Sequence, residues 1–128
     1  MKRILKVLLV IVIVIAVVIG GGIFFITRGL DSGARLAINP VDISGLADGN
    51  YSGIYNSGRF SNELKVAVKD QKIVSIDVVK DVSFPDAELT DKLFKEVITK
   101  QNTDVDVVSS GTVTSKAYLK SIENALSK

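Results

Sequence analysis

The chain opens with a long apolar run and then changes to shorter, alternating patterns. Residues Val7 to Ile26 form an unbroken stretch without a charged side chain. At about 1.5 Å per helical residue, a run of about 20 residues reaches about 30 Å, which is the thickness of the hydrocarbon core of a bilayer. The pattern therefore predicts a transmembrane helix over 7–27, preceded by a short N-terminus over 1–6.

A cleavable signal peptide is the competing interpretation of this run. Met1-Lys2-Arg3 makes a suitable positive start, and Gly20-Gly21-Gly22 offers small residues near which cleavage would be possible. However, the apolar part of a signal peptide normally ends after about 15 residues, before a small-x-small site. Here Phe24-Phe25-Ile26 continues the run instead. We favour an uncleaved anchor and leave cleavage open.

The positive residues around the run predict its orientation. Lys2, Arg3 and Lys6 precede it, whereas Arg28 and Arg35 follow it. Positive residues concentrate on the cytoplasmic side of membrane helices. We therefore expect a single-pass protein of the cell membrane, with a cytoplasmic N-terminus and a C-terminal domain outside the cytoplasm.

Residues 28–47 lack a periodic pattern. They carry Gly, Ser and the breaker pair Asn39-Pro40, so we expect a linker that tethers the domain close to the bilayer. Residues 48–128 remain for folding, which suffices for one small domain.

The first half of that domain shows the two-residue period of strands. A turn signal at Asp48-Gly49-Asn50 precedes a short strand over Tyr51–Tyr55. Two alternating segments follow, which together predict an antiparallel hairpin with its turn at Asp70-Gln71. The apolar positions of this hairpin are Leu64, Val66 and Val68 on one strand and Val74, Ile76 and Val78 on the other.

The second half changes to helical spacing. Leu89, Leu93 and Val97 predict one amphipathic helix, with Asp86 or Thr90 as its N-cap. A short strand-like segment follows over Val105–Val108. A second helix runs to the C-terminus, with an apolar face formed by Leu119, Ile122 and Leu126. Strands that precede helices indicate an α+β fold: a small antiparallel sheet with two helices, preceded by one transmembrane helix.

Composition narrows the chemistry. The chain has no cysteine and no histidine, which excludes disulfides, thiol redox motifs, iron–sulfur ligation and histidine acid–base catalysis. Any redox chemistry must come from an organic cofactor. The net charge is +2, and because the excess lies around the apolar run, the distal domain has no basic stripe for nucleic acid.

The segment Asp106 to Ala117 carries the candidate chemistry. It places the hydroxyls of Ser109, Ser110, Thr112 and Thr114 around Gly111, between a short strand and a helix. Such a loop at a helix N-terminus can hold a phosphate, because free N–H groups and the helix dipole favour an anion. Ser and Thr are also the usual N-cap residues, so a cap without a ligand stays open at this point.

The same segment resembles the flavinylation motif of the FMN-binding domain family, Asp-x-x-Ser-Gly-Ala-Thr followed by Thr-Ser-x-Ala. Upstream, Asp48-Gly49-Asn50-Tyr51-Ser52-Gly53 resembles the Asp-Gly-x-Tyr-x-Gly start of those domains, and Lys65–Asp70 with Lys72–Val74 resembles their first hairpin. The family includes the FMN-carrying subunits of Na⁺-translocating NADH:quinone reductase and related electron-transport complexes, as well as small tethered electron-transfer proteins. The resemblance implies FMN as the cofactor of a small membrane-anchored form.

In that family, a flavin transferase uses FAD to attach FMN through its phosphate to the motif threonine. The resemblance assigns Thr112 as the attachment residue, with Thr114 as the fallback acceptor. Asp106 belongs to the motif that the transferase recognises, and the remaining motif positions are Ser109, Ser110, Gly111 and Ser115. The chain departs from the pattern immediately before the threonine, where Ser110-Gly111 replaces Gly-Ala.

The resulting expectation is an electron carrier rather than a turnover enzyme, with a membrane electron-transport donor or acceptor as its partner. A cofactor-free module with a degenerate attachment motif and a module that binds FMN non-covalently are the alternatives. We interpret Asp104 and Asp106 as part of a solvated loop rather than a metal site. Tyr51, Tyr55, Phe60 and Phe84 fit the core or the hairpin face better than a flavin-stacking role.

Overall fold

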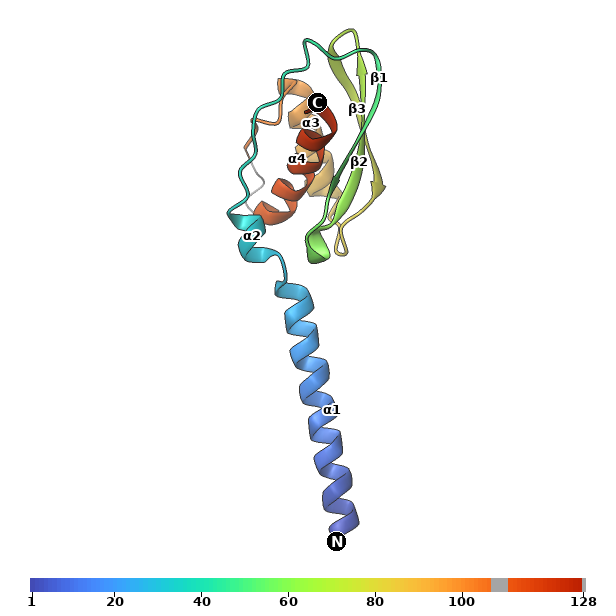
Figure 1. The fold of residues 1–128 in the computed structure, drawn as a ribbon, viewed down its shortest axis with the longest axis vertical. Helices are drawn as coiled ribbons and strands as arrows, with labels where there is room; N and C mark the ends of the chain where they lie inside the picture. Colours follow the sequence, from blue (N-terminus) through green and yellow to red (C-terminus); the bar gives the residue numbers. More distant parts are fainter. Residues whose placement is uncertain (107–110, 128) are drawn as a thin grey trace.

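The computed structural model describes residues 1–106 and 111–127. Figure 1 shows a long helix that carries a small α+β domain at its C-terminal end. The helices are α1 (Lys2–Thr27), α2 (Leu30–Ala34), α3 (Ala87–Lys100) and α4 (Thr112–Leu126). The strands are β1 (Gly49–Tyr55), β2 (Asn62–Lys69) and β3 (Lys72–Lys80), and a 3₁₀ turn, η1 (Gly58–Phe60), joins β1 to β2. The predicted α+β class is confirmed.

Helix α1 extends away from the domain, contacts the described part of it only near the helix C-terminus, and buries none of its side chains. Within the described residues, one helix is long and apolar enough to span a membrane, with a mean hydropathy of 3.3 over its most apolar stretch. It continues without a break through Gly20, Gly21 and Gly22. A solvated helix of this composition would expose its apolar side chains to water on every side, so its length and composition fit a membrane anchor.

The sheet is antiparallel, with the order β1-β2-β3. The core alternation predicted for β2 is confirmed, because Leu64, Val66 and Val68 are all buried. Asp70 and Gln71 both adopt positive φ, at 53° and 61°, which is the geometry of a tight two-residue hairpin turn.

The pattern predicted for β3 is wrong at its first and last positions, because Val74 and Val78 are both exposed. Ile73 is buried at 1% exposure, whereas Val74 is 53% exposed. The register shifts between Ala67 and Val68, so that Val68 faces Ile73 and Ala67 faces Ser75. Val74 is the extra residue of a β-bulge, and it therefore points away from the core.

Helices α3 and α4 cover one face of the sheet (Figure 1). The predicted apolar faces are confirmed, with Leu89, Leu93 and Val97 buried on α3 and Leu119, Ile122 and Leu126 buried on α4. Asp86 is the N-cap of α3, and its carboxylate accepts hydrogen bonds from the backbone N–H groups of Glu88 and Leu89.

Segment 28–47 differs from the tether that its sequence suggests. It contains the short helix α2, and from there it runs along α4 on the side opposite the sheet. Val41 is buried in the core, and the backbone of Asn39 bonds to two core side chains, Glu123 and Thr103. The segment therefore packs as part of the domain, while the boundary at Asp48 stays a prediction.

The predicted strand over Val105–Val108 falls partly outside the described residues. Val105 and Asp106 are not in a strand. Val105 instead packs partly against the core, and its N–H donates to the carbonyl of Thr103. Residues 107–110 lie outside the described part of the chain.

Candidate functional site

Thr112 is the first residue of α4, at the end of the domain nearest to α1 (Figure 1). Thr112 and Thr114 are both half-buried, and both line a cavity of about 390 Å³. A volume of this size falls within the range of small-molecule sites, about 300–1,000 Å³. The remaining wall residues are Leu30, Arg59, Phe60, Gly111 and Val113.

The N-terminus of α4 lacks a side-chain cap among the described residues. Its N-cap is Gly111, which has no side chain. The dipole of a helix of this length favours an anion at this end. The capping role that is common for Ser and Thr therefore does not apply to Thr112 or Thr114, which lie inside the helix rather than at its cap.

Gly111 is favoured by packing rather than by backbone conformation, since a larger residue would need the side chain of Leu89 to move. Its φ is −153°, which other residues also adopt. A Cβ at this position would overlap Cδ1 of Leu89 on α3. The glycine therefore lets the start of α4 approach α3, and Gly111 forms part of the cavity wall.

Arg59 supplies the positive charge of the cavity, and sequence reasoning missed it. Its guanidinium carbon lies 4.3 Å from the centre of the Phe60 ring and 5.5 Å from that of Phe84. Its Nε donates a hydrogen bond of 2.6 Å to the carbonyl of Ile26, near the end of α1. These contacts hold the cation in place. No carboxylate among the described residues pairs with it, so its charge is available to an anion in the cavity.

The sequence contains no local signal for this role of Arg59. Arg59 belongs to η1, and β2, β3 and α3 lie between it and Thr112 in the sequence. The fold brings the two together because β1 and β2 place η1 beside the N-terminus of α4. Phe60, which we expected in the core or on the hairpin face, is buried at 2% exposure and also forms part of the cavity wall, whereas Phe84, for which we expected the same, is 56% exposed.

The other predicted site residues divide into three groups. Ser115 is fully buried on the inner face of α4, so it supports the helix and is not exposed to the cavity. Asp106 is exposed in the loop before α4. Ser109 and Ser110 lie outside the described residues.

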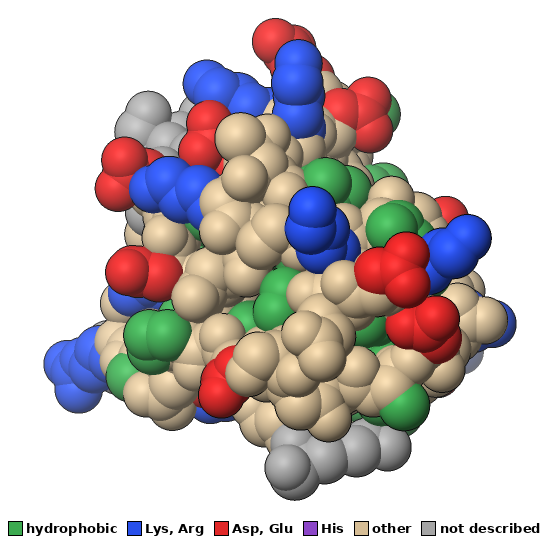
Figure 2. Space-filling model, turned by 90° about the horizontal axis from the view of Figure 1, so that it is seen from above, with side chains coloured by type: hydrophobic (Ala, Val, Ile, Leu, Met, Phe, Trp, Pro, Cys, Tyr) green, Lys and Arg blue, Asp and Glu red, His purple; other side chains and the backbone are tan. Residues whose placement is uncertain are grey.

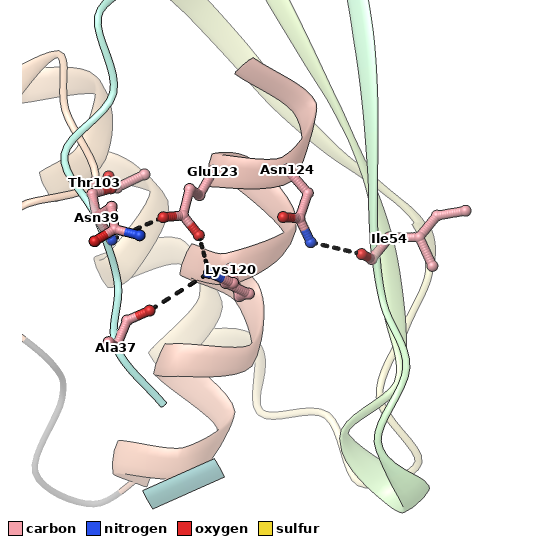
Figure 3. Close-up of polar contacts among 7 residues, drawn as sticks. All are labelled: Ala37, Asn39, Ile54, Thr103, Lys120, Glu123 and Asn124. Atoms are coloured by element: carbon pink, nitrogen blue, oxygen red, sulfur yellow. Dashed lines mark hydrogen bonds and ion pairs between the residues drawn. The ribbon is translucent and has the colours of Figure 1, made fainter. Parts of the chain in front are cut away.

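A buried polar cluster packs against the side of α4 that faces away from the sheet (Figure 3). The carboxylate of Glu123, which is 4% exposed, accepts a hydrogen bond of 2.8 Å from the N–H of Asn39 and forms an ion pair with Lys120. Lys120 also reaches the carbonyl of Ala37. Burial by itself would raise the pKa of Glu123, but the hydrogen bonds from Lys120 and Asn39 outweigh it and lower that pKa.

Tyr118 anchors the centre of α4. Its hydroxyl donates to the carboxylate of Asp81, and its ring meets that of Phe94 edge to face at 5.5 Å. Burial, together with this hydrogen bond, raises the pKa of Tyr118 well above its ordinary value. The tyrosine is thus a neutral core residue at physiological pH.

A match to a family model agrees with this geometry. The model of the FMN-binding domain matches residues 61–127, which is more than half of the chain. The matched range begins at the start of β2 and includes the whole of α4 with Thr112 and Thr114. A search of curated proteins found no match.

The chain belongs to the FMN-binding domain family, and its cofactor is FMN. The residues around the cavity fit this group. Two threonine hydroxyls, the start of α4 and the cation of Arg59 suit a phosphate, while Leu30, Phe60 and Val113 supply apolar surface for an aromatic ring.

Proposed function

We propose that this protein is a membrane-anchored flavoprotein that carries FMN on Thr112 through a phosphoester bond and transfers electrons outside the cytoplasm. The observation that carries the proposal is the place of Thr112, in the first turn of α4 and in the same cavity as Arg59. When bound, FMN would supply the redox chemistry, which the side chains of a protein without cysteine cannot supply.

A flavin transferase would attach FMN to Thr112 by a phosphoryl transfer. The Oγ of Thr112 forms a bond to the phosphorus of the FMN half of FAD, the diphosphate bond breaks, and AMP leaves while the hydroxyl loses its proton. The chain contributes the acceptor hydroxyl and an electropositive setting. The helix dipole and Arg59 both stabilise the phosphoester, which keeps one negative charge.

The intact mass of the denatured protein tests this proposal. We expect full-length protein co-expressed with a flavin transferase to gain the mass of FMN less one water and to fluoresce as a flavin after denaturation. Thr112→Val should remove both signals. Thr112→Ser, which keeps a hydroxyl at the position, serves as the matched variant and should retain at least part of the added mass.

Thr114→Val distinguishes the two acceptors, since Thr114 lines the same cavity. Loss of the added mass in Thr114→Val, with its retention in Thr112→Val, would move the attachment to Thr114. A bare polypeptide mass in the wild type, despite an active transferase, would exclude the phosphoester. Flavin released on denaturation would then indicate non-covalent FMN, and the absence of flavin a cofactor-free module.

The location outside the cytoplasm rests on the positive residues that flank α1. Lys2, Arg3 and Lys6 precede the apolar run, and two arginines follow it. In this orientation the domain would meet electron donors or acceptors of the membrane on the outer surface. The anchor would keep its concentration near such partners high.

A further inference from the structure

The cavity that contains Thr112 opens at the end of the domain that adjoins the membrane helix. Leu30, one of its wall residues, lies three positions after the last residue of α1, Thr27. Three residues span at most about 11 Å, even when fully extended. The apolar run ends one residue earlier, at Ile26, and a lipid headgroup layer is about 5–8 Å deep, so the cavity wall begins at about the height of the headgroups or just above them.

Direct contacts hold this end of the domain against α1. The Nε of Arg59 donates to the carbonyl of Ile26 over 2.6 Å, and that carbonyl belongs to the last turn of the helix. A Cβ at Gly58 would approach the carbonyl oxygen of Arg28 to 2.8 Å, so η1 and the end of α1 lie in close contact. Gly58 also has a positive φ of 53°, which suits it for this turn.

Helix α2 packs against the same end of the domain and limits how this end can rotate relative to α1. A Cβ at Gly33 would overlap Cγ1 of Val113, the residue after Thr112. Lys116 donates a hydrogen bond of 2.8 Å to the carbonyl of Ala34. Because α2 begins immediately after α1, these contacts tie the first turn of α4 to the membrane-proximal part of the chain.

The chemistry of this end suits lipid headgroups. Arg28 and Arg35 are exposed in the segment that leaves α1, and Arg59 forms part of the cavity wall. A second hollow of about 490 Å³ lies beside α1, with the polar lining Arg28, Asn56, Ser57, Gly58 and Ser61. Arginines pair well with phosphate groups, and basic residues next to a span are attracted to anionic lipids.

The opposite end of the domain has a different surface. Figure 2 views the molecule from that side and shows positive and negative side chains intermixed, with hydrophobic atoms in small separate groups. The hairpin turn after Lys69 lies at this end, and β2 separates it from η1. Eight residues of strand correspond to about 25 Å, so the two ends lie at clearly different heights above the bilayer.

We infer that the Thr112 cavity faces the bilayer at the level of the lipid headgroups, so that the membrane surface itself is the interaction surface of this end of the domain. A ligand held on Thr112 would then meet partners embedded in the same membrane, and a soluble protein docked on the distal end would not reach it. The consequence for the flavin rests on the proposed function, whereas the placement of the cavity does not.

The absence of cysteine allows a test that needs no flavin. Thr112→Cys in the full chain would carry a single thiol-reactive fluorophore at the cavity, and Lys72→Cys would carry it at the distal end. Both proteins would be reconstituted in phosphatidylcholine and phosphatidylglycerol vesicles with a nitroxide on a fraction of the headgroups. We expect the probe at Thr112 to be quenched about fivefold more strongly than the probe at Lys72, given about 25 Å between the two ends.

Two further proteins make the outcome decisive. Thr114→Cys places the probe in the same cavity and replaces Thr112→Cys if that variant fails to fold. An insertion of ten Gly and Ser residues after Arg28 should lift the domain by a coil dimension of about 17 Å and remove most of the quenching at Thr112. Equal quenching at both probe sites, whether weak or strong, would overturn the proposal.

The flavinylated wild type then separates the two proposals. Its flavin fluorescence should be quenched in the same vesicles as strongly as the probe at Thr112. If the wild type carries no flavin while the probes report a membrane-facing cavity, the proposed function fails and the placement stands. If flavin is attached but neither flavin nor probe is quenched, the placement fails and the proposed function stands.

Discussion

Gly53 of β1 lies directly against the backbone of Ser121 in α4. A Cβ at Gly53 would collide with the carbonyl oxygen of Ser121 and lie 2.6 Å from the backbone nitrogen of Ala125. The atoms in the way belong to the helix backbone, so no rotation of a side chain would relieve the overlap. The last glycine of the Asp-Gly-x-Tyr-x-Gly pattern therefore has a packing reason: it sets the distance between the sheet and the helix that begins with Thr112.

Gly53→Ala should accordingly destabilise the domain strongly. We expect a loss of about 3 kcal/mol or more in the free energy of unfolding, because α4 must move away from β1 to admit one methyl group. Urea unfolding of the full chain in detergent micelles, followed by the near-UV circular dichroism of its tyrosines, measures the loss. Ser52→Ala, on the exposed face of the same strand, is the matched control and should stay within about 0.5 kcal/mol of the wild type. Equal stability of the two variants would contradict the close approach.

The side chain of Gln101 forms hydrogen bonds to the backbone of β3, as a neighbouring strand would. Its side-chain oxygen accepts a hydrogen bond of 2.5 Å from the N–H of Ile73, and its amide nitrogen donates to the carbonyl of Ile73 over 2.9 Å. The residue ends α3 with a left-handed φ of 57°, which directs the side chain toward the strand. One amide thus satisfies both backbone groups of a buried strand residue.

Gln101→Ala should cost about 2 kcal/mol, because it leaves the N–H and the carbonyl of Ile73 without these partners. Gln101→Gly separates the two roles of the residue, since glycine accepts the left-handed conformation but cannot bond to Ile73. We expect both variants to be destabilised in urea unfolding, and Gln101→Gly less so. Full stability in Gln101→Gly would show that only the backbone conformation matters. Lys100→Ala, an exposed neighbour, provides the baseline.

The buried carboxylate of Glu123 predicts how stability depends on pH. Its pKa is lowered in the folded protein, so the stability it contributes is present above the unfolded pKa of about 4.3–4.5 and is lost as pH falls through the folded pKa. Glu123→Gln retains an acceptor for the N–H of Asn39 but loses the ion pair with Lys120. We expect it to be less stable than the wild type by about 1 kcal/mol at pH 7.

The difference between Glu123→Gln and the wild type should shrink below about pH 4, where the wild-type carboxylate also becomes neutral. Urea midpoints of both proteins, measured between about pH 3 and about pH 8, follow this difference. The range includes the ordinary carboxylate pKa of about 4.3. Asn124 lies on the same helix as Glu123 and donates an exposed hydrogen bond to the carbonyl of Ile54 on β1. Asn124→Ala removes this bond and should show no such pH dependence. A constant difference between Glu123→Gln and the wild type across this range would contradict the assignment.

The parts of the fold that the sequence predicted are those that depend on local spacing. The alternation of β2, the apolar faces of α3 and α4 and the cap at Asp86 are each written within one element, so period and capping chemistry suffice to find them. Thr112 was singled out in a similar way, through a motif contained within one loop and the turn that follows, and its role as the attachment residue stays a prediction.

The parts that were missed depend on contacts between distant residues. The bulge at Val74 arises from the register with β2, and the burial of Val41 arises from bonds to Asn102, sixty-one positions away. The role of Arg59 requires η1, the end of α1 and the first turn of α4 to meet. No pattern within a single element carries that information, because the hydrophobic period of one segment does not specify which other segment covers it.

The orientation of the anchor gives the last prediction. Lys72 is exposed at the end of the domain farthest from α1, so Lys72→Cys offers the one thiol of the chain to solvent. With the domain outside the cytoplasm, a membrane-impermeant maleimide should label this variant in intact cells as fully as in permeabilised cells. Replacing Lys2, Arg3 and Lys6 with Gln in the same background removes the positive residues before the span and leaves Arg28 and Arg35 after it.

That variant should insert partly or wholly in the opposite orientation, because positive residues then remain only on the domain side. We expect labelling in intact cells to fall to about half or less of the labelling after permeabilisation. Replacement of Lys65, Lys69 and Lys80 with Gln removes the same amount of charge from strands of the folded domain, more than 30 residues after the end of α1 in the sequence, and should leave labelling unchanged. Labelling of Lys72→Cys only after permeabilisation would place the domain in the cytoplasm, and the proposed phosphoester of Thr112 would then require a transferase in that compartment.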